Sequence, residues 1–264
     1  MAESKGAVAE IHGTAVVDAS AELGPDVVVG PYCVIGPNVV LAESVRLGAH
    51  VVIERDTGIG AGCVIHSGAV LGGDPQDLKY RGEPTRLVVG PRTVVRECVT
   101  LNRGTSARGT TEIGSDCLLM AYAHVAHDCV IGNNVVLANA VNMGGHVLIE
   151  DWAIVGGLTA IHQFARIGQH AIVSGMSAVR KDVPPFVKAA GNPLHLYSLN
   201  SVGLQRRGIP EASRKALKQL YRLFFLSNQN ISQALAAAQQ EIEPLPEVLA
   251  FLRFVQESQR GITV

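Results

Sequence analysis

The sequence predicts a mainly β protein, a solenoid of stacked short strands in residues 1–190 with a small α-helical C-terminal domain in residues 191–264. Three observations predict this fold. Aliphatic residues recur with a period of six, which fits neither a helix nor an alternating strand. Aromatic residues make up only 5% of the 264-residue chain, whereas 28 residues are glycine. The composition then changes at the turn-forming sequence Gly191-Asn192-Pro193.

The period of six is nearly unbroken. It runs from Ile11 to Leu71, from Val89 to Leu101 and from Ile113 to Val179, and every one of its 26 positions is Ile, Val, Leu or Met. At 47% apolar content, chance would give such a run with a probability on the order of 10⁻⁹. A coil that turns a corner every six residues, with one aliphatic side chain inward per face, explains the pattern.

The position four residues after each aliphatic residue is also restricted to small or β-branched side chains, which we expect to pack beside the corner. Glycine often follows the aliphatic residue, as at Gly24 and Gly30, and we expect it to relieve the bend. Four of the five cysteines occupy the small inward position, which favours packing over a disulfide framework, and only Cys98 does not. These four are Cys33, Cys63, Cys117 and Cys129.

Residues 191–264 hold half of the aromatic residues and only four glycines. Hydrophobic residues at helical spacing predict three helices there. The first opens at Pro210-Glu211, the second runs from Ile231 to Glu241, and the third starts near Pro246-Glu247.

Charge and hydropathy exclude several classes of protein. The net charge of −1 argues against a protein that coats nucleic acid. No apolar run approaches the ~18 residues of a membrane span. The N-terminal sequence MAESKGAVAE lacks the apolar core of a signal peptide. We therefore expect a cytoplasmic protein with no nucleic-acid partner and no membrane span.

With its period of six, the chain resembles the hexapeptide-repeat acyltransferases, whose fold is a left-handed parallel β-helix of triangular section. Their coils contain three hexapeptides, so the resemblance implies about ten coils here. The repeat is interrupted at 72–88 and 102–112, which predicts loop insertions. A long polar loop in a compact repeat is more often functional than decorative, although an inert surface insertion is the alternative.

Four of the nine histidines cluster in the sequence. On an 18-residue coil, His127 stacks with Gly145 and Gln163, and Asp128 stacks with His146. Neighbouring coils lie about 4.8 Å apart, so these groups are expected to share one surface patch. The four histidines are His124, His127, His146 and His162.

This patch suits a histidine that acts as a general base on a substrate hydroxyl, because no Ser, Cys or Lys nucleophile stands at its centre. Gly145 could offer its backbone N–H to a developing oxyanion. Zinc binding is the rival hypothesis, since three histidines from neighbouring coils can bind this metal.

Five longer sequence motifs make the resemblance more specific. They resemble the acyl-carrier-protein:UDP-N-acetylglucosamine O-acyltransferases of lipid A biosynthesis over essentially the whole chain. The resemblance implies transfer of an (R)-3-hydroxyacyl group from acyl carrier protein to the glucosamine 3-hydroxyl, with no cofactor and no metal. The motifs are Gln76-Asp77-Leu78-Lys79-Tyr80, Gly82-Glu83-Pro84-Thr85-Arg86, Ala123-His124-Val125-Ala126-His127-Asp128-Cys129, His162-Gln163-Phe164 and Arg206-Arg207-Gly208.

By the same resemblance, His127 is the general base, Asp128 orients it and Gly145 donates the oxyanion N–H. Long-chain acyl groups are implied by Gly175, with Ile172 and Met176 nearby. Other residues would contact the sugar, the pyrophosphate, the acyl chain or the nucleotide. They are Gln76, Asp77, Lys79, His124, His146, His162, Gln163, Asn200, Arg206 and Arg207.

One departure concerns Val202, which stands where some relatives carry an acid that touches the nucleotide. The family works as a homotrimer with active sites between subunits, so the resemblance also implies that assembly. Basic residues outnumber Glu211 in residues 206–222, which is consistent with an ordinary solvated helix face or with docking of the acidic carrier protein.

Three alternatives stay open. The first is the related N-acyltransferase, against which the repeat's early start at Ile11 argues, because that enzyme usually carries an additional N-terminal domain. The second is a zinc-dependent carbonic anhydrase of the same fold. The third is a solenoid without catalysis, for which His127→Ala would change nothing measurable.

Overall fold

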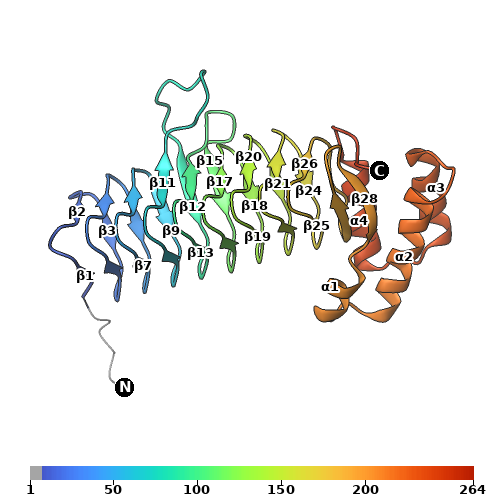
Figure 1. The fold of residues 1–264 in the computed structure, drawn as a ribbon, viewed down its shortest axis with the longest axis horizontal. Coiled ribbons are helices and arrows are strands. Elements are labelled where there is room, and N and C mark those ends of the chain that lie inside the picture. The colour runs from blue at the N-terminus through green and yellow to red at the C-terminus, as the bar shows by residue number, and fades with distance from the viewer. Residues whose placement is uncertain (1–7) are drawn as a thin grey trace.

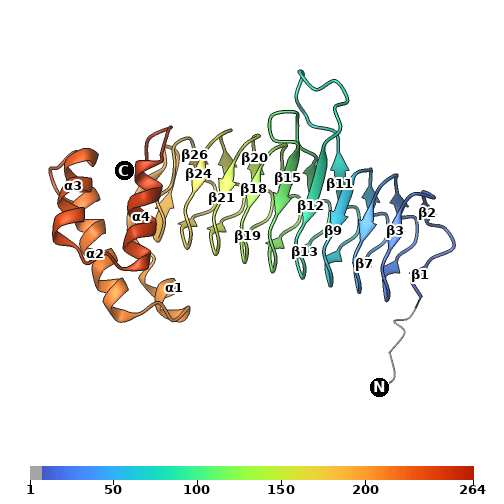
Figure 2. The ribbon, with the colours of Figure 1, turned by 180° about the vertical axis from the view of Figure 1, so that it is seen from behind.

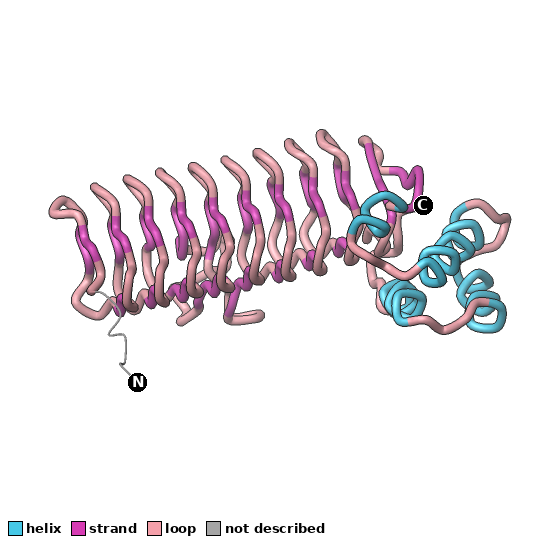
Figure 3. Tube along the Cα trace, turned by 90° about the horizontal axis from the view of Figure 1, so that it is seen from below, coloured by secondary structure: helices cyan, strands magenta, loops and turns pink. Residues whose placement is uncertain are grey.

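A computed structural model of the chain describes residues 8–264, and Figure 1 shows their arrangement. As the sequence predicts, a left-handed parallel β-helix is followed by a few helices at its C-terminal end. Each coil contributes one short strand to each of three sheets, which we call faces A, B and C. Figure 2 shows the same stack of coils from behind, and Figure 3 shows it from below.

The strands stack in register along each face. Face A contains β1 (Glu10–Ile11), β4 (Val28–Val29), β7 (Arg46–Leu47), β10 (Val64–Ile65), β13 (Val94–Val95), β16 (Leu118–Leu119), β19 (Val136–Leu137), β22 (Ile154–Val155), β25 (Ile172–Val173), β27 (Val187–Ala190) and the antiparallel β28 (His195–Leu199). Face B contains β2 (Val16–Val17), β5 (Val34–Ile35), β8 (Val52–Ile53), β11 (Val70–Gly73), β14 (Thr100–Asn102), β17 (His124–Val125), β20 (Asn142–Met143), β23 (Ala160–Ile161) and β26 (Ala178–Val179). Face C contains β3 (Glu22–Leu23), β6 (Val40–Leu41), β9 (Thr57–Ile59), β12 (Arg86–Val89), β15 (Thr110–Ile113), β18 (Val130–Ile131), β21 (Leu148–Ile149) and β24 (Arg166–Ile167).

The core is the column of inward side chains. The aliphatic residues of the period are buried from Val29 to Val179, and the four cysteines at the small position are buried beside them. Ile11 is 44% exposed because, among the described residues, its coil packs against a neighbour on one side only. The three faces form a narrow triangular prism, and each coil fills it with one aliphatic side chain per face. The core therefore has no room for aromatic residues.

The expectation that these glycines relieve the bend at the corners is wrong. The left-handed backbone conformation falls two residues after Gly24 and Gly30, at Asp26 and Tyr32, both with φ of 58°. The glycines are instead required by close stacking. A Cβ at Gly24 would lie 2.8 Å from the backbone nitrogen of Glu43 on the next coil.

We name each edge of the prism by the two faces it joins. Edge AB holds the turns at Tyr32, His50 and Met176. Edge CA holds those at Trp152 and His170.

Edge BC holds the turns at Asp128 and His146, and both interruptions of the repeat leave the prism there. The loop of residues 74–85 joins β11 to β12, and the loop of residues 103–109 joins β14 to β15 (Figure 1). Val70 of β11 still pairs with Thr100 of β14, and the register shifts only after Leu71, where the first loop is about to leave.

The helices at the C-terminal end are α1 (Ser201–Arg206), α2 (Glu211–Phe225), α3 (Ile231–Glu241) and α4 (Pro246–Gln256). The last three are the helices that the sequence predicts, whereas α1 was not expected. The four helices enclose a second core that includes Leu220, Phe224 and Phe251. Phe186, at the end of the prism, packs in this core. No helix in residues 8–264 has the length and apolar character of a membrane span. The division at 190/191 stays a prediction.

Candidate active site

The histidine patch forms at edge BC, at the turns that follow β17, β20 and β23. His124 pairs with Asn142 in the strand register, which confirms the 18-residue coil on which the prediction rests. Asp128 and His146 occupy left-handed turn positions, with φ of 60° and 62°. The turn geometry repeats from coil to coil, so these side chains lie in one column along the edge.

His127 and Asp128 form a hydrogen-bonded pair. His127 Nδ1 lies 2.9 Å from Asp128 Oδ2, and the Asp128 side chain is completely buried. An ionised carboxylate only accepts hydrogen bonds, so in the neutral imidazole Nδ1 carries the proton and Nε2 keeps its lone pair. The His127 side chain is 13% exposed, which leaves Nε2 able to receive a proton from a bound substrate.

The loop of residues 103–109 holds Asp128 in place through Thr105. The Thr105 N–H donates to Asp128 Oδ1 at 2.9 Å, and the Thr105 hydroxyl donates to Oδ2 at 2.6 Å. Burial would raise the pKa of Asp128, but the hydrogen bonds from Thr105 and His127 outweigh it and lower that pKa. Sequence reasoning missed Thr105, although its place in an interruption of the repeat was a signal.

Gly145 lies directly against His127. A Cβ at position 145 would stand 2.6 Å from His127 Nε2, so only glycine leaves room for the imidazole. The backbone N–H of Gly145 donates no hydrogen bond within residues 8–264. Pro25 and Pro37 occupy the same turn position on other coils. Because proline has no backbone N–H, the fold does not need a hydrogen bond from this position.

His146 completes the centre of the patch. Its Nε2 lies 3.7 Å from Asp128 Oδ2, and its ring stacks on Phe164 with centroids 4.5 Å apart. Burial lowers the pKa of His146, although the carboxylates of Asp128 and Asp77 act in the opposite direction. The effect of Asp77 indicates that the loop of residues 74–85 approaches the patch.

The remaining candidates surround this centre. His124 lies on β17 and pairs with the Thr100 hydroxyl at 2.7 Å, while burial and the nearby His127 lower its pKa. His162 and Gln163 are exposed at the turn after β23, where His162 Nδ1 contacts the Gln163 carbonyl at 2.9 Å. Together these groups give edge BC a polar surface around the His127 imidazole.

The loop of residues 74–85 presents Gln76 and Lys79 to solvent and Asp77 half-buried. Asp77 Oδ1 accepts a hydrogen bond from the Lys79 N–H at 2.9 Å, which shapes the tip of the loop. Arg103 anchors its base from within the protein. Arg103 as a whole is 1% exposed, and its guanidinium donates to the Gly72 carbonyl, to the Asp74 carboxylate and, at 3.2 Å, to the Tyr80 hydroxyl.

Three candidates lie at the other end of face C, along edge CA. Asn200 is 1% exposed, caps α1 by accepting from the Gly203 N–H, and donates to the His170 carbonyl. Arg206 is exposed, and Arg207 follows α1 and packs against Trp152. Val202 is 54% exposed on the same helix.

Two further candidates lie along edge AB. Gly175 is exposed in the turn after β25, and Ile172 points outward from β25 on face A. Within one chain the structure therefore brings together the catalytic candidates with His124, His146, His162 and Gln163 at edge BC, the edge from which the loop that carries Gln76, Asp77 and Lys79 also extends. The nucleotide and acyl-chain candidates lie on the two other edges of the prism.

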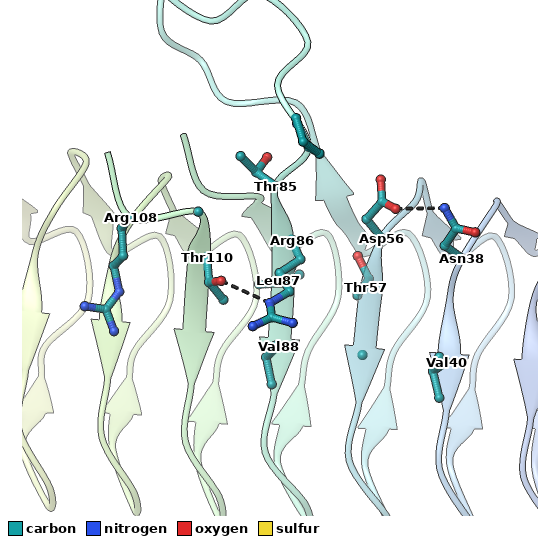
Figure 4. A pocket seen from close by; sticks show the side chains of 13 residues that line it. Asn38, Val40, Asp56, Thr57, Thr85, Arg86, Leu87, Val88, Arg108 and Thr110 are labelled. Atoms are coloured by element: carbon teal, nitrogen blue, oxygen red, sulfur yellow. Dashed lines mark hydrogen bonds between the residues drawn. The ribbon is translucent and has the colours of Figure 1, made fainter. Parts of the chain in front are cut away.

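A groove of about 670 Å³ on face C lies beside edge BC. Figure 4 shows Arg86, whose Nε donates to the Thr110 hydroxyl at 3.1 Å, and Asn38, whose amide donates to Asp56 at 2.9 Å. None of the candidate residues lines this groove. The candidate active site stays at His127, because a general base needs a free nitrogen near its substrate and cavity volume does not supply one.

One group of side chains in residues 8–264 converges closely enough to hold a metal ion. The potential ligand atoms of His127, Asp128 and His146 lie within 4.8 Å of one another. Both Asp128 oxygens already accept hydrogen bonds from Thr105 and His127. His124 and His162 lie outside this group, so a set of three histidines is not assembled among the described residues.

A triangular β-helix with a histidine–aspartate pair on one edge defines the chain as a hexapeptide-repeat transferase. A family model described as bacterial transferase hexapeptide matches residues 110–145. A second one, described as UDP N-acetylglucosamine O-acyltransferase, domain 2, matches residues 182–263.

Comparison with known proteins identifies the family. The acyl-[acyl-carrier-protein]–UDP-N-acetylglucosamine O-acyltransferase of Janthinobacterium sp. (strain Marseille) is 47% identical over 96% of this chain and 98% of its own length. The enzyme of the same name from Anaeromyxobacter sp. (strain Fw109-5) is 46% identical over 75% of this chain and 78% of its own length. The chain belongs to this family of O-acyltransferases, and it is an enzyme.

Solved structures agree. The structure of LpxA from Acinetobacter baumannii superposes with a TM-score of 0.93 at 41% identity, covering 96% of this chain and 99% of that one. LpxA from Bacteroides fragilis, described as a UDP-N-acetylglucosamine acyltransferase, gives a TM-score of 0.94 at 35% identity, with coverage of 96% and 100%.

Proposed function

We propose that this enzyme transfers an (R)-3-hydroxyacyl group from acyl carrier protein to the 3-hydroxyl of UDP-N-acetylglucosamine, the first step of lipid A biosynthesis. The names of its relatives support the carrier and the acceptor. The observation that carries the mechanism is the His127–Asp128 pair, in which Nδ1 is engaged and Nε2 is free.

In the proposed reaction, His127 Nε2 takes the proton of the sugar hydroxyl as the oxygen attacks the thioester carbonyl. The carbon–sulfur bond then breaks, and the imidazolium returns the proton to the departing carrier thiol. Asp128 stabilises the imidazolium that forms between these steps. The free N–H of Gly145 stabilises the negative charge on the carbonyl oxygen. No covalent enzyme intermediate is required.

The placement of the candidates on three edges supports a homotrimer with the site between subunits. If edge BC of one protomer lies against face A of the next, His127 meets both the Arg207 edge and the Gly175 edge of its neighbour. Face A is suited to such a contact because an apolar, half-buried stripe runs along it. This stripe consists of Val28, Val64, Val94, Leu118, Val136, Ile154 and Ile172.

The acceptor is held, in this proposal, by the loop and patch residues of edge BC and by the arginines of edge CA. Lys79 is exposed at the loop tip and Arg206 at the end of α1, where each can meet a phosphate. Gly175 leaves the end of the acyl groove open, which favours a long chain, and Ile172 borders it.

The acidic carrier protein would dock on the basic surface of the helices. Arg206, Lys215, Lys218 and Arg222 are exposed there, although Lys215 is paired with Glu211 at 2.8 Å. Exposed charges of this kind speed association with an acidic partner and make it sensitive to salt. Since its carrier and nucleotide substrates are cytosolic, we propose a cytoplasmic location.

The experiment is to mix the purified protein with (R)-3-hydroxyacyl carrier protein and UDP-N-acetylglucosamine and to detect acylated nucleotide by mass spectrometry. We expect product from the wild type, loss of product with His127→Ala, and full activity with the control His50→Ala on edge AB. Product only with an amino-sugar nucleotide would instead indicate an acceptor with a 3-amino group in place of the 3-hydroxyl. Stoichiometric zinc together with carbon dioxide hydration would indicate the carbonic anhydrase.

A further inference from the structure

Edge CA carries a ladder of three aromatic side chains on consecutive coils that the reaction chemistry does not use. The Trp152 and His170 rings are parallel within 2° with centroids 6.1 Å apart, and His170 lies 5.7 Å from Phe186. All three residues occupy left-handed turn positions. Phe186 is completely buried, His170 is 7% exposed and Trp152 is 38% exposed, so the ladder rises from the core to the surface.

Arg207 lies on this ladder. Its guanidinium carbon is 4.8 Å from the centroid of the Trp152 ring, within the range of a cation–π contact. Its Nη1 donates to the Trp152 carbonyl and to His170 Nδ1, both at 3.2 Å. Arginine has no acceptor, so His170 must be neutral with its proton on Nε2.

The His170 environment keeps that acceptor available. Burial and the charge of Arg207 lower the pKa of His170 to about 4. Asn200 donates to the His170 carbonyl at 2.9 Å and caps α1, which fixes the helix that carries Arg207 relative to the ladder. The ladder and the cap together determine where the guanidinium stands.

The contacts with the ladder use only Nη1 of the Arg207 guanidinium. Arg207 Nε and Nη2 donate no hydrogen bond within residues 8–264, and the side chain is half-buried. These two nitrogens form the fork with which arginine binds two oxygens of one phosphate.

We propose that Trp152 and His170 are positioning residues that hold Arg207 with this fork open for the diphosphate of a nucleoside diphosphate. The inference rests on the proposed function, since it concerns how that enzyme binds its nucleotide. It predicts that His170 acts on the nucleotide only through Arg207.

Trp152 makes the test direct because it is the only tryptophan of the chain. UDP is titrated into the full-length protein while Trp152 emission is recorded. KM for UDP-N-acetylglucosamine and kcat are measured in parallel. The variants are His170→Phe, which keeps a stacked ring but removes the acceptor, Arg207→Ala, and the double variant. His50→Phe is the matched control, since His50 stacks on Tyr32 at a left-handed position of edge AB.

We expect UDP to change Trp152 emission in the wild type and in His50→Phe. Arg207→Ala should weaken UDP binding at least about tenfold, because it removes both charged hydrogen bonds of the fork. His170→Phe should raise Kd and KM several-fold with kcat unchanged, and it should add nothing in the Arg207→Ala background. Equal losses from His170→Phe in both backgrounds would overturn the inference while product formation leaves the proposed function standing. A wild type that neither binds UDP nor forms product would overturn both.

Discussion

Thr105 and Asp128 are 23 residues apart in the sequence, yet the Thr105 hydroxyl donates to Asp128 Oδ2 at 2.6 Å. The same oxygen accepts from His127 Nδ1 at 2.9 Å. One carboxylate oxygen therefore ties the inserted loop of residues 103–109 to the His127 imidazole, and the loop becomes part of the candidate site.

Thr105→Val should lower kcat about tenfold, because it removes one hydrogen bond to a buried charge while keeping the shape of the side chain. KM for both substrates should change little, since the Thr105 hydroxyl contacts the buried Asp128 carboxylate. Thr105→Ser keeps the hydroxyl and should restore most of the rate. Steady-state kinetics of the three proteins measures this, and equal kcat values for valine and threonine would contradict the assigned role.

Gly145→Ala should abolish most of the activity without unfolding the protein. The new Cβ would stand 2.6 Å from His127 Nε2, so the imidazole has to leave its position beside Asp128. Gly58→Ala on face C is the matched control, because nothing lies within 4 Å of its added Cβ. Activity assays and thermal melts check both, and an active Gly145→Ala enzyme would show that the imidazole moves freely.

His170 should make the protein less stable in acid. Its pKa falls from 6.5 to about 4 on folding, through burial and then through the charge of Arg207, so between these values the unfolded chain binds more protons. Its contribution to the free energy of unfolding is complete above pH 6.5 and decreases by on the order of 3 kcal/mol as the pH falls to 4.

Urea unfolding of the wild type and of His170→Phe at pH 7, 5.5 and 4 isolates this contribution. The difference between the two proteins should shrink as the pH falls. Parallel curves at all three values would indicate that His170 has a similar pKa in the folded and unfolded states.

The thiols should differ sharply in reactivity. Burial raises the pKa of Cys129 to about 12 and raises those of Cys33, Cys63 and Cys117, so their thiolates are scarce at pH 8. Cys98 is half-buried at a turn of edge AB. Ellman's reagent should label one thiol rapidly in the folded protein and five in guanidinium chloride. Fast labelling of several thiols in the folded protein would exclude the packing role.

Leu118→Asp should dissociate the proposed homotrimer and abolish activity, because it places a charge in the apolar stripe of face A. Val16→Asp is the control, since Val16 is 63% exposed on the first coil of face B. Size-exclusion chromatography with light scattering and the acyltransferase assay are the measurements. An active, monomeric Leu118→Asp protein would rule out a site shared between subunits.

Much of the fold and the centre of the site follow from the period. An 18-residue coil aligns His127 with Gly145 and Asp128 with His146, so their convergence at edge BC was predictable. The three helices were predictable because apolar residues recur in them at helical spacing, and Pro210 and Pro246 mark where two of them begin. The six-residue helix α1 was not, since Val202 and Gly203 are poor helix formers and its stability depends on the Asn200 cap.

The sequence by itself determined the stacked coils, the buried aliphatic column and the turn positions of the histidines, because each depends on a regular repeat. Only the tertiary structure decided what the irregular parts contact. The loop lengths break the period, so the hydrogen bonds of Thr105 to Asp128 and of Arg103 to Asp74 depend on three-dimensional packing. The glycines belong to the same group, because the backbone of the next coil, and not the local bend, excludes a Cβ at Gly24.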